Sequence, residues 1–290
     1  ITIGDPNGIG IEIILKSLSN FSLFQECNFI IYASTALIEK QKQYFQIDTP
    51  SLRKIDSEED LSDTQINVKE VFSNSEFNFG ESNKKLSALG ILSLKEATKA
   101  IKGNKIDVLV TAPINKDLSY SNSFKYTGHT DFLKHYFSTN PLMVMMSEEL
   151  KIALLTDHIP IKDVSNAIDQ DFVEQKIKAL ETSLINDFQI KKPKIAVLAV
   201  NPHAGDNGVI GNEDQSIITP AINTFKGTTS SINGPFSADT FFVNENYKKY
   251  DGIIASYHDQ GLIPFKTISF GKGVNFTAGL PVVRTSPDHG

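Results

Sequence analysis

Short runs of valine, isoleucine and leucine alternate along the chain with longer stretches in which apolar residues recur at helical spacing. This alternation is typical of βαβ units and predicts an α/β fold with a mostly parallel sheet. The runs are almost continuously apolar, which indicates strands that are buried on both faces. We expect strands at 28–32, 107–111, 142–146, 151–155, 194–200 and 252–255, and helices at 8–18, 35–44, 84–101, 171–184 and 215–225.

The expected helix 84–101 carries Leu86, Gly90, Leu94, Ala97 and Ile101 on one face. That face should lie in a core or an interface, and the glycine would let another backbone approach closely. The polar stretches 51–63 and 226–233 are interpreted as exposed connections. The length allows one large domain or two lobes, with no boundary visible in the sequence.

Composition narrows the class of partner. The chain has 290 residues, is 40% hydrophobic and carries a formal net charge of −6. Its basic residues are scattered, which argues against nucleic acid or an anionic membrane as a partner and favours a small molecule. The single cysteine, Cys27, cannot form an internal disulfide, and we expect it to be buried. We find neither a membrane-spanning run nor a signal pattern, and expect a cytoplasmic protein.

Three histidines each follow an apolar run that is predicted to be a strand: His158 after 152–155, His203 after 195–200, and His258 after 253–255. Open α/β sheets bind ligands at the carboxyl ends of their strands, so the three imidazoles could converge on one point. Three neutral imidazoles with an open position are typical of a catalytic divalent-metal site. Partly buried histidines that only form hydrogen bonds are the alternative.

Other segments carry candidate ligands for an anion. The opening ITIGDPNGIGIEI has its glycines at the wrong spacing for a dinucleotide fingerprint, and leaves either an anion site at a helix N-terminus or a tight turn. In YTGHTDFL, His129, Thr130 and Asp131 could bind a ligand or cap a helix. Further cations and a carboxamide suit a phosphate or carboxylate: Lys266, Lys272, Asn275 and Arg284. Solvated surface charge is the alternative, above all for Lys272.

Long motifs occur along nearly the whole chain in a distinctive order: GDPNGIGIE, TGHTDFL, NPHAGDNGVIGNED, GPFSADTFF, SYHDQGLIPFK and GVNFTAGLPVVRTSPDHG. In these motifs the chain resembles the 4-hydroxythreonine-4-phosphate dehydrogenase family, whose product feeds pyridoxal phosphate synthesis. Many relatives have GDPAGIGPE at the start, whereas this chain has Asn7 and Ile11 at the variable places.

The resemblance implies a two-lobed α/β fold like that of the isocitrate and isopropylmalate dehydrogenases, with the active site in a cleft, in a homodimer. It implies NAD or NADP and a divalent metal (zinc, magnesium or cobalt) as cofactors. A segment beyond Gly290 is expected to help hold the nicotinamide, so no cofactor-binding residue is assigned. The implied metal ligands are the three strand-end histidines, His158, His203 and His258.

Ligands of the phosphorylated substrate implied by the resemblance are His129, Thr130, Lys266, Asn275 and Arg284. Lys266, Asp239 and His129 are candidates for proton transfer, because each can titrate or donate.

The implied reaction is oxidation and β-decarboxylation of 4-phosphohydroxy-L-threonine, giving 3-amino-2-oxopropyl phosphate. Three alternatives remain: a dehydrogenase of a phosphorylated four-carbon sugar acid such as threonate or erythronate 4-phosphate, a protein that binds metal and phospho-ligand without turnover, and a metal-dependent hydrolase.

Overall fold

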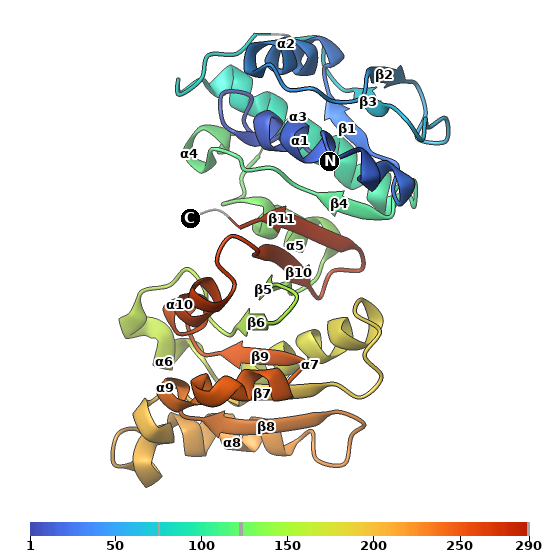
Figure 1. Ribbon diagram of the computed structural model, residues 1–290. Coiled ribbons are helices and arrows are strands. Elements are labelled where there is room, and N and C mark those ends of the chain that lie inside the picture. The colour runs from blue at the N-terminus through green and yellow to red at the C-terminus, as the bar shows by residue number, and fades with distance from the viewer. Residues whose placement is uncertain (75, 122–123, 289–290) are drawn as a thin grey trace. The chain divides into compact units, whose positions relative to one another are not determined.

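A computed structural model describes residues 1–74, 76–121 and 124–288 of the chain. The chain divides into two compact units, each with helices packed on a sheet (Figure 1). The first unit comprises Ile1–Tyr136 and Val282–Pro287, and the second comprises Phe137–Pro281 and the residues from Asp288. The first unit is therefore built from two pieces of chain that are far apart in sequence. None of the helices in these ranges combines the length and apolar composition needed to cross a bilayer.

The first unit is built on parallel strands. Strands β1, β3 and β2 pair in that order, and β4 pairs with β11. Thr2 forms parallel bridges to both Tyr32 and Thr111, so the first residues of the chain join β1 to β4. The strands are β1 (Ile30–Ala33), β2 (Leu52–Ile55), β3 (Ile66–Glu70), β4 (Val108–Val110) and β11 (Val283–Pro287).

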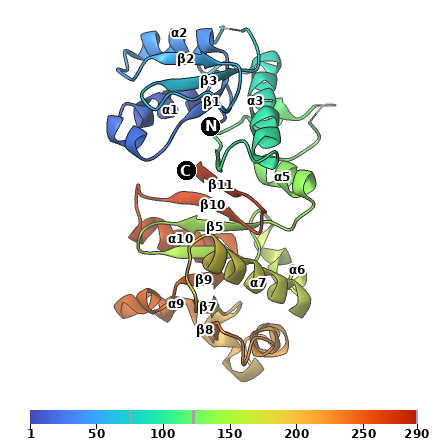
Figure 2. The same ribbon diagram turned by 90° about the vertical axis from the view of Figure 1, so that its right-hand side faces the viewer.

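Helices cover both faces of this sheet. Ile31, Ala33 and Val68 form a core with α1 and α2 on one face, whereas α3 lies on the other (Figure 2). The helices are α1 (Gly10–Leu18), η1 (Phe21–Gln25), α2 (Thr35–Phe45), α3 (Lys84–Lys102), α4 (Lys116–Ser119) and α5 (His129–Phe137).

The second unit has a mixed sheet with the order β10-β5-β6-β9-β7-β8. From β6 to β8 the neighbours run parallel, whereas β5 is antiparallel to both β6 and β10. The strands are β5 (Leu142–Met146), β6 (Lys151–Leu154), β7 (Lys194–Leu198), β8 (Ser231–Phe236), β9 (Gly252–Ala255) and β10 (Val274–Ala278).

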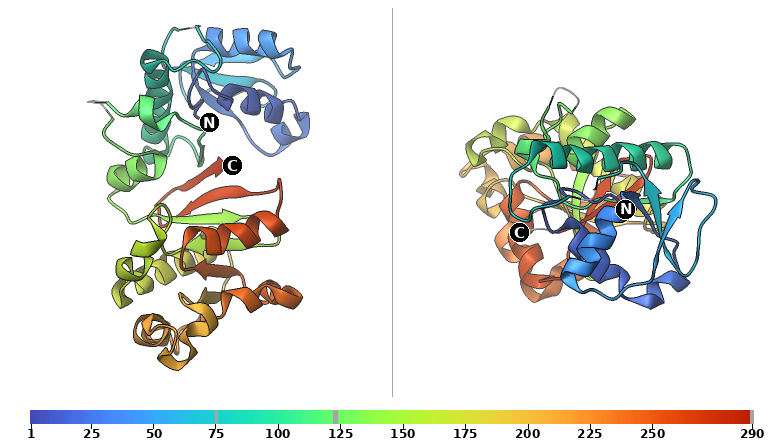
Figure 3. Two further views of the ribbon diagram at one scale, coloured as in Figure 1. Left: turned by 90° about the vertical axis from the view of Figure 1, so that its left-hand side faces the viewer. Right: turned by 90° about the horizontal axis from the view of Figure 1, so that it is seen from above.

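Helices α7 and α10 lie on opposite faces of this second sheet (Figures 2 and 3). Leu262 and Phe265 of α10 pack on Ile152 and Ala255, while α7 lies close to Gly252 through Leu180. The helical segments are η2 (Ile161–Asp163), α6 (Val164–Ala167), α7 (Gln170–Asn186), η3 (Pro202–Gly208), η4 (Asp214–Ile218), α8 (Thr219–Asn223), α9 (Ala238–Phe241), η5 (Val243–Lys249) and α10 (His258–Ile268).

The α/β class and the mostly parallel pairing are confirmed. The interpretation of 51–63 and 226–233 as connections was wrong in part, because these segments contain β2 and the start of β8. Both are terminal strands in the strand orders above, and such strands need not be continuously apolar. The expected helix 215–225 is a π-helical turn followed by the short α8. Cys27 is exposed, contrary to expectation.

Candidate active site

The three histidines predicted to bind a metal follow three neighbouring strands of the second unit. Strands β6, β9 and β7 lie side by side and run parallel, so their carboxyl ends share one edge of the sheet. His158 follows β6, His258 follows β9, and His203 follows β7. The strand-end placement is confirmed, and the binding of a metal there remains a prediction.

Two of these histidines lie next to each other. The ring centroids of His158 and His258 are 5.5 Å apart, and the rings are inclined by 53°. His158 is exposed, and its backbone N–H donates to Asp157 Oδ1 over 2.7 Å. Two imidazoles at this separation are available to the same ligand.

His258 has a carboxylate beside its ring. Its Nδ1 lies 2.7 Å from Asp259 Oδ1. An ionised carboxylate only accepts hydrogen bonds, so Nδ1 carries the proton in the neutral ring and Nε2 keeps its lone pair for a metal. His258 is the first residue of α10.

His203 lies in an exposed turn whose backbone is left-handed, with φ of 53° at the histidine itself. Within residues 1–74, 76–121 and 124–288, no three His, Cys, Asp or Glu side chains lie close enough together to hold one metal ion. The structure therefore brings two of the predicted ligands together, and His203 as the third stays a prediction.

The remaining candidates of the second unit lie on α10, β10 and α9, and in the case of Lys272 between α10 and β10. Lys266 is in α10, and its Nζ is 3.6 Å from Asp288 Oδ1. Asn275 is half-buried in β10, opposite Met145 of β5. Asp239 is exposed on α9, and Lys272 is also exposed. No contact joins Asp239 to Lys266 among the described interactions.

His129, Thr130 and Arg284 belong to the first unit. His129 begins α5 and Thr130 follows it. Asp131 is not the N-cap residue, because it lies inside α5. Its carboxylate accepts from the backbone N–H of Thr127 over 3.0 Å. Arg284, in β11, is only 3% exposed, and its Nη2 donates to Thr111 Oγ1 over 2.6 Å. Burial lowers the pKa of Arg284 to about 10, so the guanidinium remains charged at neutral pH.

The opening motif holds the first unit together. Asp5 accepts from the backbone N–H of Asn7 and from the hydroxyl of Ser87. The Asn7 carboxamide donates to the carbonyl of Glu81 over 2.9 Å and accepts from the N–H of Asn78 over 2.8 Å. An alanine at this place could form neither bond. The structure thus favours the tight-turn interpretation of this segment.

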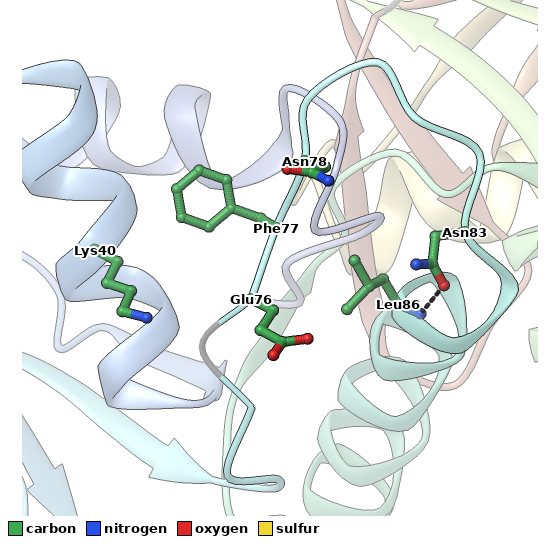
Figure 4. A pocket seen from close by; sticks show the side chains of 6 residues that line it. All are labelled: Lys40, Glu76, Phe77, Asn78, Asn83 and Leu86. Carbon is green, nitrogen blue, oxygen red and sulfur yellow. Dashed lines mark hydrogen bonds between the residues drawn. The ribbon is translucent and has the colours of Figure 1, made fainter.

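The first unit also contains a pocket of about 390 Å³ between α2, α3 and the segment before α3 (Figure 4). The side chain of Asn83 accepts from the N–H of Leu86 there and caps α3. The lining residues are Lys40, Glu76, Phe77, Asn78, Asn83 and Leu86. None of them is a predicted site residue.

Sequence reasoning missed the carboxylates that surround the histidine loops. Asp259 bonds to His258, and Glu213 and Asp214 bond to Asn201 just before His203. The available signal was the acidic pair that closes the motif NPHAGDNGVIGNED. Residues that hold a metal ligand in place are as much part of such a site as the ligand.

Comparisons with known proteins identify a family that this chain matches. The family of the pyridoxal phosphate biosynthetic protein PdxA matches residues 25–290. A protein of Sulfurihydrogenibium sp. (strain YO3AOP1) named 4-hydroxythreonine-4-phosphate dehydrogenase is 41% identical, over 100% of this chain and 89% of its own. A protein of Oceanobacillus iheyensis named putative D-threonate 4-phosphate dehydrogenase is 34% identical, over 100% and 89%.

A solved structure agrees with these sequence matches. The crystal structure of 4-hydroxythreonine-4-phosphate dehydrogenase from Klebsiella pneumoniae superposes with a TM-score of 0.88 at 33% identity. The match covers 100% of this chain and 88% of that one.

Proposed function

Because the chain belongs to the PdxA family, we propose that it oxidises 4-phosphohydroxy-L-threonine with NAD or NADP, and that the oxidised product loses carbon dioxide. The observation that carries the proposal is 41% identity, over the whole chain, to a protein named 4-hydroxythreonine-4-phosphate dehydrogenase. The final product would be 3-amino-2-oxopropyl phosphate, for pyridoxal phosphate synthesis.

The proposed chemistry balances in two steps. In the first, the carbon that bears the hydroxyl loses a hydride to the nicotinamide, and the hydroxyl loses a proton. The resulting ketone lies β to the carboxylate, so carbon dioxide can leave while the ketone oxygen takes up the electrons of the broken bond. The enolate that remains then takes up one proton on the carbon that lost carbon dioxide.

We place the metal on the three histidines at the strand ends, whose residue types suit it. The donor set of His158, His203 and His258 suits a divalent ion with an open position. Asp259 supports this by fixing the proton on Nδ1 of His258, which leaves Nε2 as a donor. A metal held there would supply Lewis acidity, which favours ionisation of the substrate hydroxyl.

We assign the anchoring of the substrate to His129, Thr130, Lys266, Asn275 and Arg284. The phosphate is remote from the reacting carbon, so contacts to it serve to orient the substrate. The buried cation of Arg284 suits a phosphate, which guanidinium can bind through two parallel hydrogen bonds. Lys266, Asp239 and His129 remain the candidates for proton transfer. A cytoplasmic homodimer belongs to the same proposal.

A second candidate is oxidation of D-threonate 4-phosphate, favoured by the Oceanobacillus iheyensis protein at 34% identity. The two substrates differ at the carbon next to the carboxylate, which carries an amino group in one and a hydroxyl in the other. The phosphate and metal contacts would serve both.

The test is the reduction of NAD or NADP, followed by absorbance, with each substrate and with either a divalent metal or a chelator. We expect metal-dependent reduction with 4-phosphohydroxy-L-threonine. Turnover with D-threonate 4-phosphate alone would favour the second candidate. Binding of the substrates without reduction would contradict both, and release of inorganic phosphate without cofactor would indicate a hydrolase.

A further inference from the structure

The turn that carries His203 has an unusual backbone. Five consecutive residues are left-handed, with φ of 53° at His203, 53° at Ala204, 79° at Gly205, 43° at Asp206 and 56° at Asn207. Only the third of these is a glycine, and other residues occupy this region at an energetic cost. Such a conformation persists only where the surroundings enforce it. The question is therefore what holds this turn.

A buried carboxylate holds the entry to the turn. Asp214 is 1% exposed, and its oxygens accept from the backbone N–H groups of Val200 (2.7 Å) and Asn201 (3.0 Å). The Asn201 side chain donates to Asp214 Oδ2 over 3.1 Å and to Glu213 Oε2 over 2.8 Å. Asn201 is thus fixed by both its backbone and its side chain, just before His203.

The far end of the turn is packed against Asn201. A Cβ at Gly211 would lie 2.6 Å from Asn201 Nδ2, and one at Gly205 would lie 2.5 Å from the carbonyl oxygen of Gly211. Real Cβ atoms do not make such contacts. The two glycines allow the loop to close tightly on Asn201.

The second oxygen of Glu213 reaches a different loop. Glu213 Oε1 accepts from the hydroxyl of Ser165 over 2.5 Å. Ser165 is in α6, which follows the 3₁₀ turn η2 after His158. The hydrogen bonds from Ser165 and Asn201 lower the pKa of Glu213, so the carboxylate stays ionised at neutral pH. One charged group therefore connects the chain segments that carry two of the proposed metal ligands.

We propose that Glu213 is a positioning residue that fixes the His158 segment relative to the His203 turn, and that Asp214 and Asn201 hold that turn in its left-handed form. This inference rests on the proposed function, because it assumes that both histidines bind one metal. It assigns roles to residues that contact neither metal nor substrate. When a carboxylate that orients a metal ligand is lost, metal affinity typically falls by about 10–100-fold.

The test is a Co²⁺ titration of the metal-free, full-length protein, followed by the visible d–d absorption of the bound ion. This readout reports affinity and coordination geometry without any turnover. We expect Glu213→Gln to weaken Co²⁺ binding by about tenfold or more and to change the band at saturation. His203→Ala should lose the wild-type band. The matched control is Glu245→Gln, which removes an exposed ion pair with Lys248 in the same unit and should leave the titration unchanged.

Two further variants keep the proposal falsifiable if Glu213→Gln folds poorly. Ser165→Ala removes only the contact to α6 and should weaken binding in the same direction. Adding it to Glu213→Gln should cost little more, because one bridge is lost in both. If Glu213→Gln and Ser165→Ala both leave the Co²⁺ titration and its band as in the wild type, the bridging role of Glu213 is overturned and the metal site is not. Absence of a band in the wild type would overturn the metal site, and the bridge with it.

Discussion

Arg284 is a buried cation in a strand of the first unit. It is 3% exposed in β11, and burial lowers its pKa to about 10 while leaving it charged at neutral pH. A buried guanidinium bears a desolvation cost that a bound anion would offset. We therefore expect the side chain to act mainly in anchoring the phosphate of the substrate.

Arg284→Lys should raise KM for the phosphorylated substrate by about tenfold or more and change kcat less. Lysine cannot form the paired hydrogen bonds of a guanidinium, and it loses its charge more readily when buried. Steady-state kinetics would measure both constants. The control is Arg53→Lys, because the other arginine pairs with Asp60 at the surface. An unchanged KM in Arg284→Lys would contradict the phosphate role.

At the scale of elements, α3 is placed by a close backbone contact. The spacing of Leu86, Gly90 and Leu94 predicted both a buried face and a glycine that admits another backbone. The structure confirms this, since a Cβ at Gly90 would lie 2.1 Å from the carbonyl oxygen of Gly4. The opening motif and α3 therefore position each other.

Gly90→Ala should lower the free energy of unfolding by about 1–3 kcal/mol, because two backbone segments must move apart to admit the methyl group. Alanine has the higher helix propensity, by about 1 kcal/mol, so the sign of the effect separates packing from propensity. Urea denaturation would measure it. Ala88→Gly, on the exposed side of the same helix, supplies the propensity difference alone. An increase in stability on Gly90→Ala would refute the close contact.

For the whole molecule, the pH dependence of stability should reflect groups such as Glu213 that are hydrogen-bonded in the folded state. Its pKa is lowered on folding by the bonds from Ser165 and Asn201. A carboxyl with a lowered folded pKa stabilises the protein above its unfolded pKa of roughly 4.3. That contribution is lost as the pH falls through the folded pKa.

The wild type should exceed Glu213→Gln in free energy of unfolding by about 1 kcal/mol at pH 7, and the difference should shrink as the pH falls below roughly 4.3. Urea denaturation of both proteins across this range is the measurement. Glu245→Gln, which alters an exposed pair, should show a much smaller difference at every pH. A gap that stays constant down to low pH would mean that the charge of Glu213 contributes nothing.

Local sequence pattern was enough to predict the α/β class, the buried strands β1, β6, β7 and β9, and the placement of three histidines after strands. These follow from local pattern, because a strand covered on both faces must be continuously apolar, as β9 is. Motif order determined the family. Strands β2, β3, β8, β10 and β11 were not predicted. Of these, β2 and β8 are terminal strands, which need not carry a continuously apolar pattern.

The residues that surround the histidines are set by contacts between distant parts of the chain. One neighbour of β6 is β9, about a hundred residues further along the chain, and no local pattern encodes that pairing. The same holds for Ser165 and Asn201, which meet on Glu213 from separate loops. The left-handed turn at His203 is likewise invisible in sequence, because its non-glycine residues adopt that conformation only under the constraint of Asp214 and Asn201.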